Sequence, residues 1–239
     1  MCEKIYMISI VILSLSLDSV HQYLIAEREE TLYDHIIFSQ RWPATVCKVW
    51  TRNDPPLRRC HFPAQRHRWT VHGIWPTMLG DKYPEFCNDS LPYNLNEIKS
   101  IEKDLEQVWT QVEEEGFDLW GHEWRKHGTC ATDLEPLKSQ FDYFRKGIEW
   151  NQEYSLSDIL SAAEIFPSDT RMLTPQELGS AVKDKTKKQP MISCASVDEI
   201  QYLYELRICF DKNLTIIDCD PFVHLSCDAS KGMIYPILV

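Results

Sequence analysis

The sequence has few basic residues for its length and lacks a hydrophobic run long enough to cross a membrane. It holds 25 Lys and Arg against 36 Asp and Glu, a formal net charge of −11 over 239 residues. This balance argues against a protein that wraps duplex nucleic acid, because such proteins carry a basic surface. The longest apolar run covers residues 5–17, which is shorter than the roughly 20 residues of a transmembrane helix. We therefore expect a protein without a membrane span.

The apolar run has the features of a secretory signal peptide. Lys4 supplies a positive flank, and the run that follows has the length of a signal-peptide core. We predict a signal peptide over residues 1–21, cleaved near Ser19 to Gln22, and a single domain over residues 22–239. A buried N-terminal helix is the alternative interpretation. The signal peptide predicts a secreted or lysosomal protein.

Cysteine usage agrees with an oxidising compartment. Of the nine cysteines, Cys2 lies in the predicted signal peptide, which leaves an even set of eight. Even sets in secretory proteins predict disulfides, although spacing alone does not give their connectivity. No Cys-x-x-Cys pair supports a structural zinc site. Two N-glycosylation sequons begin at Asn88 and Asn213.

Helices are expected in the middle of the chain and strands toward both ends. Apolar residues at spacings of three and four predict helices over 94–116, 137–150 and 157–165, and Thr174-Pro175 opens another. Strand-like stretches cover 69–75, 191–195, 200–210 and 214–219. This order predicts an α+β fold, with a mostly antiparallel central sheet flanked by helices and stapled by disulfides.

The first segment with chemical potential is Trp69–Pro76, which reads WTVHGIWP. On a strand, Thr70, His72 and Ile74 would share a face. Gly73 follows the histidine and would let another group approach closely. Trp75 adds an aromatic face. A lone histidine on a strand is more often structural than catalytic, so a catalytic role for His72 requires further catalytic side chains from another segment.

The second segment, 122–130, reads HEWRKHGTC. At 100° per residue, a helix places four of its side chains within an arc of about 140°. These four are His122, Glu123, Lys126 and His127. Gly128 would end the helix, and Cys130 could anchor that end. A solvated charged face is the alternative to a catalytic one.

Other chemistries fit these residues less well. A zincin needs two histidines at i and i+4, whereas His122 and His127 are five residues apart, so we predict no metal site. No Gly-x-Ser-x-Gly elbow or Walker loop occurs in the sequence. Two imidazoles with a carboxylate and an ammonium suit RNA cleavage, in which one group takes the 2′-hydroxyl proton and another protonates the 5′-oxygen.

Both segments resemble, in order and separation, the two active-site segments of the ribonuclease T2 family. Further similarity covers Gln40–Pro43 with Cys47, which look like the family's first strand, and Pro190–Cys194 with Cys209 and Cys219 in its C-terminal half. The resemblance thus extends over essentially the whole chain after the predicted signal peptide. Thr77 stands where some members carry a base-reading Asp, and Gly121 where relatives often carry a larger residue.

The resemblance implies roles for individual residues. His127 would be the general base, His72 the general acid, and Glu123 a third catalytic group. His122 and Lys126 would hold the phosphate and its transition state, and Trp75 and Tyr83 would bind bases. The implied disulfides are Cys47–Cys60, Cys87–Cys130, Cys194–Cys227 and Cys209–Cys219.

We therefore expect a monomeric endoribonuclease that acts on single-stranded RNA. It would need no cofactor or metal and would form a 2′,3′-cyclic phosphate. A secreted signalling or host-interaction protein with incidental catalysis is one alternative. A metal-dependent phosphoesterase is the other, disfavoured by the histidine spacing.

Overall fold

The computed structural model describes residues 33–52, 58–80, 83–113, 118–220 and 227–238. The predicted signal peptide, residues 1–21, lies outside these ranges. No helix within them is long and apolar enough to cross a membrane. The following description concerns the structural unit that begins at Tyr33.

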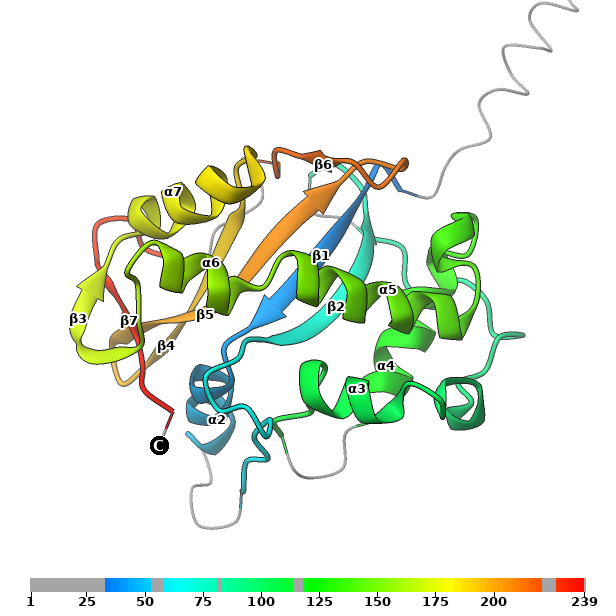
Figure 1. The fold of residues 1–239 in the computed structure, drawn as a ribbon, viewed down its shortest axis with the longest axis horizontal. Coiled ribbons are helices and arrows are strands. Elements are labelled where there is room, and N and C mark those ends of the chain that lie inside the picture. Colours follow the sequence, from blue (N-terminus) through cyan, green and yellow to red (C-terminus); the bar gives the residue numbers. More distant parts are fainter. Residues whose placement is uncertain (1–32, 53–57, 81–82, 114–117, 221–226, 239) are drawn as a thin grey trace, which may run out of the picture. The chain divides into compact units, whose positions relative to one another are not determined.

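A seven-stranded sheet lies at the centre of this part of the chain (Figure 1). Strand β5 is central: β1 and β7 pair along one of its edges, and β4 and β6 along the other. Strand β2 continues the sheet beyond β1, and β3 continues it beyond β7. The strands are β1 (His35–Arg41), β2 (Thr70–Thr77), β3 (Ser168–Leu173), β4 (Met191–Val197), β5 (Ile200–Phe210), β6 (Ile216–Ile217) and β7 (Met233–Tyr235).

The sheet is mixed, which corrects the prediction of a mostly antiparallel one. Strand β7 runs parallel to β5, with Tyr202 opposite Ile234. Hairpin signals predict only antiparallel neighbours, whereas a parallel strand returns through a longer connection. Here that connection includes Cys227, which is bonded to Cys194 on β4. A strand as short as Met233–Tyr235 carries no sequence pattern of its own.

Six α-helices and three short 3₁₀ helices complete the described fold. Helix α5 crosses the face of the sheet in front of β1 and β2, and α6 continues along the same layer (Figure 1). Trp150 of α5 stacks on Phe210 of β5 with ring centroids 4.1 Å apart, which joins helix and sheet. The helices are α2 (Pro43–Thr51), α3 (Glu102–Val108), α4 (Leu119–Lys126), α5 (Gln140–Glu153), α6 (Leu156–Ala162), α7 (Pro175–Thr186), η1 (Leu95–Ile98), η2 (Gly128–Cys130) and η3 (Glu135–Leu137).

Several predicted boundaries are confirmed and others are wrong. Strand β5 has the predicted range, and α7 begins with a capping box between Thr174 and Glu177. In the described part of the helix predicted over 94–116, residues 94–113, the chain instead forms the turn η1 followed by α3, and the Asn94 side chain accepts the Asn96 N–H at the start of the 3₁₀ turn. Only residues 216–217 of the predicted strand 214–219 pair in the sheet.

The segment expected to form the first strand, Gln40–Pro43 with Cys47, is divided between a strand and a helix. Gln40 and Arg41 end β1, but Pro43 occupies the first turn of α2, and Cys47 lies on that helix. Proline suits a helical first turn because that position needs no N–H donor. The Trp42 indole donates to the Pro236 carbonyl at 2.9 Å, which fixes the junction.

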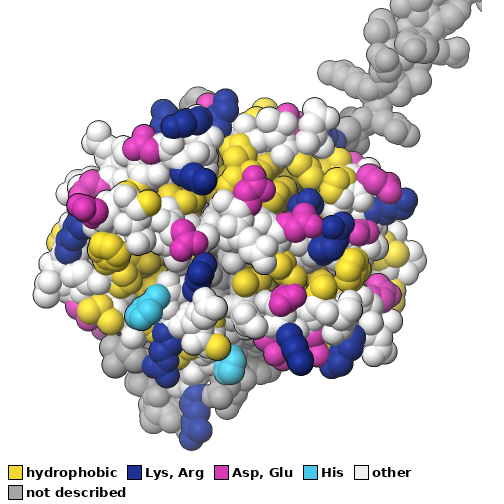
Figure 2. Space-filling view, viewed as in Figure 1, with side chains coloured by type: hydrophobic (Ala, Val, Ile, Leu, Met, Phe, Trp, Pro, Cys, Tyr) yellow, Lys and Arg dark blue, Asp and Glu magenta, His cyan; other side chains and the backbone are white. Residues whose placement is uncertain are grey.

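Four disulfides staple the fold, and they are the four pairs that the family resemblance implies. Cys87–Cys130 holds the end of the segment that follows α4. Acidic and basic side chains are interspersed over the face shown in Figure 2. The acidic net charge is therefore not concentrated on that face.

Candidate active site

Helix α4 presents the second chemical segment to the sheet. It runs from Leu119 to Lys126 and is capped by Asp118, whose carboxylate accepts the Gly121 N–H at 2.9 Å. His127 follows with φ −117°, and the η2 turn leads to the Cys87–Cys130 disulfide. Trp124 lies in the core and Arg125 is exposed, so neither residue of this segment outside the predicted arc faces the pocket.

Strand β2 carries the first segment, with an irregularity at the histidine. Along β1, Gln40 faces Val71 and Ser39 faces Gly73, so His72 is an extra residue without a partner in the register. Such a bulge re-aims side chains. The prediction that His72 and Ile74 share a face is therefore wrong: Ile74 lies in the core and His72 lines a pocket.

The two segments meet in one pocket of about 250 Å³. All seven residues predicted to be catalytic, phosphate-binding or base-binding line this pocket. They are His72, Trp75, Tyr83, His122, Glu123, Lys126 and His127. The other lining residues are Ile37, Thr77 and Arg207.

Glu123 is buried against Gly73 and Trp75. The Trp75 indole N–H donates to Glu123 Oε2 at 2.8 Å. A Cβ atom at Gly73 would lie 2.1 Å from that oxygen, which confirms that the glycine permits a close approach. Burial raises the pKa of Glu123, while the charge of His72 and the indole hydrogen bond act in the opposite direction.

His127 lies in a buried and electropositive setting. Its Nδ1 atom has no hydrogen-bond partner among the described residues. Burial, together with the charges of Lys126, His122 and His72, lowers the pKa of His127 to about 2. This imidazole therefore stays neutral at acidic pH values at which an ordinary histidine would be protonated.

His72 contacts a buried carboxylate on the neighbouring part of the sheet. Its Nδ1 lies 2.6 Å from Glu205 Oε2, and the Glu205 side chain is only 2% exposed. Arg207 Nε donates to the other oxygen at 2.5 Å. Burial would raise the pKa of Glu205, but the charges and hydrogen bonds of Arg207 and His72 outweigh it and lower that pKa to about 2.

Sequence reasoning missed Glu205 and Arg207. Two charged residues in the apolar strand 200–210 were the available signal, because charges are seldom buried without partners. The distance of 133 residues between Glu205 and His72 hides their contact.

Lys126 and His122 line the remaining side of the pocket. Lys126 Nζ lies 2.9 Å from Glu85 Oε1 and 5.6 Å from the centre of the Tyr83 ring. Burial and the charge of Lys126 lower the pKa of His122. Tyr83 is 44% exposed, so its ring offers more open surface than that of Trp75, over which Arg207 lies at 5.1 Å.

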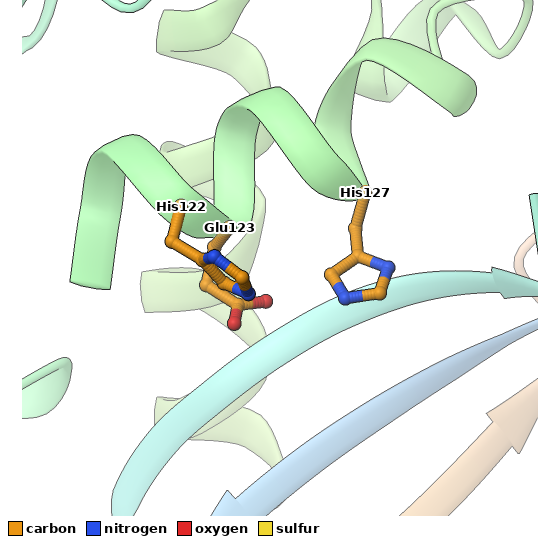
Figure 3. A group of neighbouring side chains, drawn as sticks. All are labelled: His122, Glu123 and His127. Atoms are coloured by element: carbon orange, nitrogen blue, oxygen red, sulfur yellow. The ribbon is translucent and has the colours of Figure 1, made fainter. Parts of the chain in front are cut away.

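Three side chains lie close enough to be considered as metal ligands. The ligand atoms of His122, Glu123 and His127 all lie within 4.8 Å of one another, pointing from α4 toward β2 (Figure 3). The spacing of five residues predicted that a helix would hold the two histidines too far apart to share a metal ion. His127 lies after the last residue of α4, so helical geometry does not fix its position relative to His122. Ligands of a tetrahedral zinc ion are about 3.4 Å apart, so these side chains would have to shift to hold one.

Comparisons with known proteins agree with the fold and the pocket. The profile described as "Ribonuclease T2 family" matches residues 33–219. Ribonuclease Oy of Magallana gigas is 31% identical over 212 residues, which cover 85% of this chain and 96% of that protein.

Solved structures are similar over nearly the same region. RNase NT in complex with 5′-AMP has a TM-score of 0.73 and 26% identity, and the match covers 86% of this chain and 99% of that one. Human RNase T2 has a TM-score of 0.70 and 29% identity, with the same coverage of 86% and 99%. The class of protein is thus an RNA-cleaving enzyme of mixed α+β fold. The chain belongs to the ribonuclease T2 family and is a ribonuclease.

Proposed function

We propose that this endoribonuclease cleaves single-stranded RNA by transesterification, without a metal ion. The observation that carries the proposal is the meeting of three imidazoles, a carboxylate and an ammonium in one pocket. In this reaction the substrate supplies its own nucleophile, the 2′-hydroxyl. The enzyme supplies a base, an acid and a cationic setting for the phosphorus oxygens.

His127 is the general base in this proposal. A base must be neutral to accept a proton, and the lowered pKa of His127 keeps it neutral at acidic pH. Its Nδ1 is buried, so the proton passes to Nε2. The 2′-oxygen then forms its bond to phosphorus.

His72 is the general acid. It donates a proton to the 5′-oxygen while the bond between that oxygen and phosphorus breaks. The products are a 2′,3′-cyclic phosphate and a free 5′-hydroxyl. Slow hydrolysis of the cyclic product to a 3′-phosphate follows when water takes the place of the leaving group and the two histidines exchange roles.

Glu123 is the third catalytic group, and His122 and Lys126 stabilise the phosphate. The positive charge of Lys126 lowers the pKa of His122 and of His127. The same charge favours a phosphate anion over a metal cation in this pocket. Trp75 and Tyr83 bind bases by stacking. Thr77 lines the pocket where some family members carry an Asp, so the base preference depends on this residue and its neighbours.

A substrate with one ribonucleotide in an otherwise deoxyribose strand tests the proposal. Only the bond that follows the ribose has a 2′-hydroxyl nucleophile, so cleavage should occur at that bond alone. The all-deoxy strand is the control and should remain intact. Cleavage of the all-deoxy strand would contradict transesterification.

We also propose a secreted or lysosomal location and a monomeric state. Disulfides persist in oxidising compartments, and four are present here. Asn88 and Asn213 are exposed, as glycan acceptors must be. The signal peptide proposed for residues 1–21 would supply the route.

A further inference from the structure

The partner of the proposed general acid has no role in the mechanism derived above. Glu205 lies on β5, where it is buried beneath the pocket, and its carboxylate contacts His72 Nδ1 at 2.6 Å. Its second oxygen is held by Arg207 at 2.5 Å. Each carboxylate oxygen of Glu205 thus contacts one partner, His72 or Arg207, and these two contacts fix the orientation of the carboxylate.

The protonation state of Glu205 determines which nitrogen of His72 carries hydrogen. The lowered pKa of Glu205 keeps its carboxylate ionised, and an ionised carboxylate accepts hydrogen bonds only. Nδ1 of His72 must therefore be the donor, so its hydrogen stays on that nitrogen in the neutral ring. When the ring is protonated, the exchangeable hydrogen lies on Nε2.

The backbone of His72 is fixed as well. The Trp109 indole N–H donates to the His72 carbonyl at 2.9 Å, across the bulge in β2. The ring is thus held at its carbonyl and at Nδ1. Its remaining polar atom, Nε2, is the one left for a substrate, and the side chain is 25% exposed at the pocket.

We propose that Glu205 is the positioning residue of the general acid: it fixes the His72 ring with Nδ1–H toward the sheet and Nε2–H toward the leaving 5′-oxygen. This inference rests on the proposed transesterification. As the 5′-oxygen takes the Nε2 proton, His72 becomes neutral and keeps its Nδ1–H bond to Glu205. The ring therefore needs no reorientation between turnovers.

Glu205 also stabilises the imidazolium form of His72 by its charge. Other charged and titratable groups near His72 come from β5 and from α4 with the residue after it: Arg207, His122, Glu123, Lys126 and His127. Most of these are cationic when protonated and oppose a further positive charge. Two buried carboxylates, Glu205 and Glu123, offset this charge, and Glu205 is the one in direct contact with the ring.

A comparison of two leaving groups tests this inference. One substrate is a dinucleotide, whose 5′-alkoxide must be protonated as it leaves. The other is a nucleoside 3′-(p-nitrophenyl phosphate), whose nitrophenolate leaves without a general acid. Glu205→Gln should reduce kcat/KM for the dinucleotide by roughly tenfold to a hundredfold. It should change the rate for the aryl ester by less than about threefold, because that substrate makes no use of the acid.

A variant that keeps the charge gives a second readout. Glu205→Asp, which restores the charge, should recover part of the loss. Glu113→Gln is the matched control, since it removes another ion-paired carboxylate, which is partly buried, pairs with Arg41 and does not contact His72. It should leave the ratio of the two rates unchanged.

A measurement on the wild-type protein covers the case in which the variant does not fold. The ¹⁵N chemical shifts of His72 in neutral solution should show hydrogen on Nδ1. Hydrogen on Nε2 with none on Nδ1 would overturn the inference, as would an equal loss, or no loss, with both substrates in a folded Glu205→Gln variant. If the wild type cleaves neither substrate, the proposed ribonuclease mechanism itself fails, which is a distinct result.

Discussion

Replacing Gly73 by alanine should disable the site through a single methyl group. The added Cβ would lie 2.1 Å from Glu123 Oε2 and 2.1 Å from Trp75 Nε1, whereas ordinary contacts begin at 3.4 Å. Both groups must retreat by more than about 1 Å, which would break the hydrogen bond that joins them. The φ angle of Gly73 lies outside the left-handed region, so alanine can adopt this backbone and the effect is steric.

Both activity and stability should respond. A displacement of about 1 Å in a catalytic group can cost on the order of a hundredfold in rate. Overpacking in a filled site costs about 1–3 kcal/mol of unfolding free energy. The assays are kcat on a short RNA and urea unfolding of the same preparation.

The control is Gly179→Ala in α7, away from the pocket. There the nearest atom to an added Cβ is the end of the Gln189 side chain at 3.1 Å. Alanine is favoured over glycine in a helix by about 1 kcal/mol, which opposes any cost of the contact with Gln189. The variant should therefore keep its stability, and it should keep its activity because Gly179 does not line the pocket. A folded Gly73→Ala enzyme with wild-type kcat would refute the account of Glu123 and Trp75.

Three further predictions follow from the same structure. Removing the Cys87–Cys130 disulfide, whose cysteines are 43 residues apart, should lower the free energy of unfolding by about 4 kcal/mol. Removing Cys209–Cys219, whose cysteines are 10 residues apart, should lower it by about 3 kcal/mol. Denaturant unfolding of the two double Cys→Ala variants measures the difference. The lowered pKa of His127 keeps the base neutral in acid, so kcat/KM should stay high well below pH 6.5. It should fall on the alkaline side because a general acid must carry the proton that it donates, and a profile that rises steadily through pH 8 would contradict this. EDTA should leave cleavage unchanged, and a full loss restored by zinc would instead support the alternative metal site.

Local patterns predicted the parts of the fold that local interactions determine. Helical geometry predicted an arc of four side chains, and these residues, three on α4 and His127 directly after it, line the pocket. The start of α7 follows from Thr174, whose hydroxyl and N–H are both paired with Glu177 within one turn. The range 200–210 follows from β-branched and aromatic residues.

The missed features depend on contacts between distant segments. The bulge at His72 arises from pairing with β1, which no pattern in 69–76 reveals, and it reverses the expected face of Ile74. Glu205 is recognisable as unusual in its strand, but its link to His72 appears only when β5 and β2 are folded on either side of β1.

The central claim is transesterification through His72, and the ends of the products test it most directly. A short defined RNA would be incubated at pH 5 in EDTA with disulfide-intact wild-type protein and with His72→Ala, and the fragments identified by mass spectrometry. The account predicts a 2′,3′-cyclic phosphate and a 5′-hydroxyl from the wild type and no cleavage by the variant. Products with 5′-phosphates, equal cleavage by His72→Ala, or no cleavage by folded wild-type protein would contradict it.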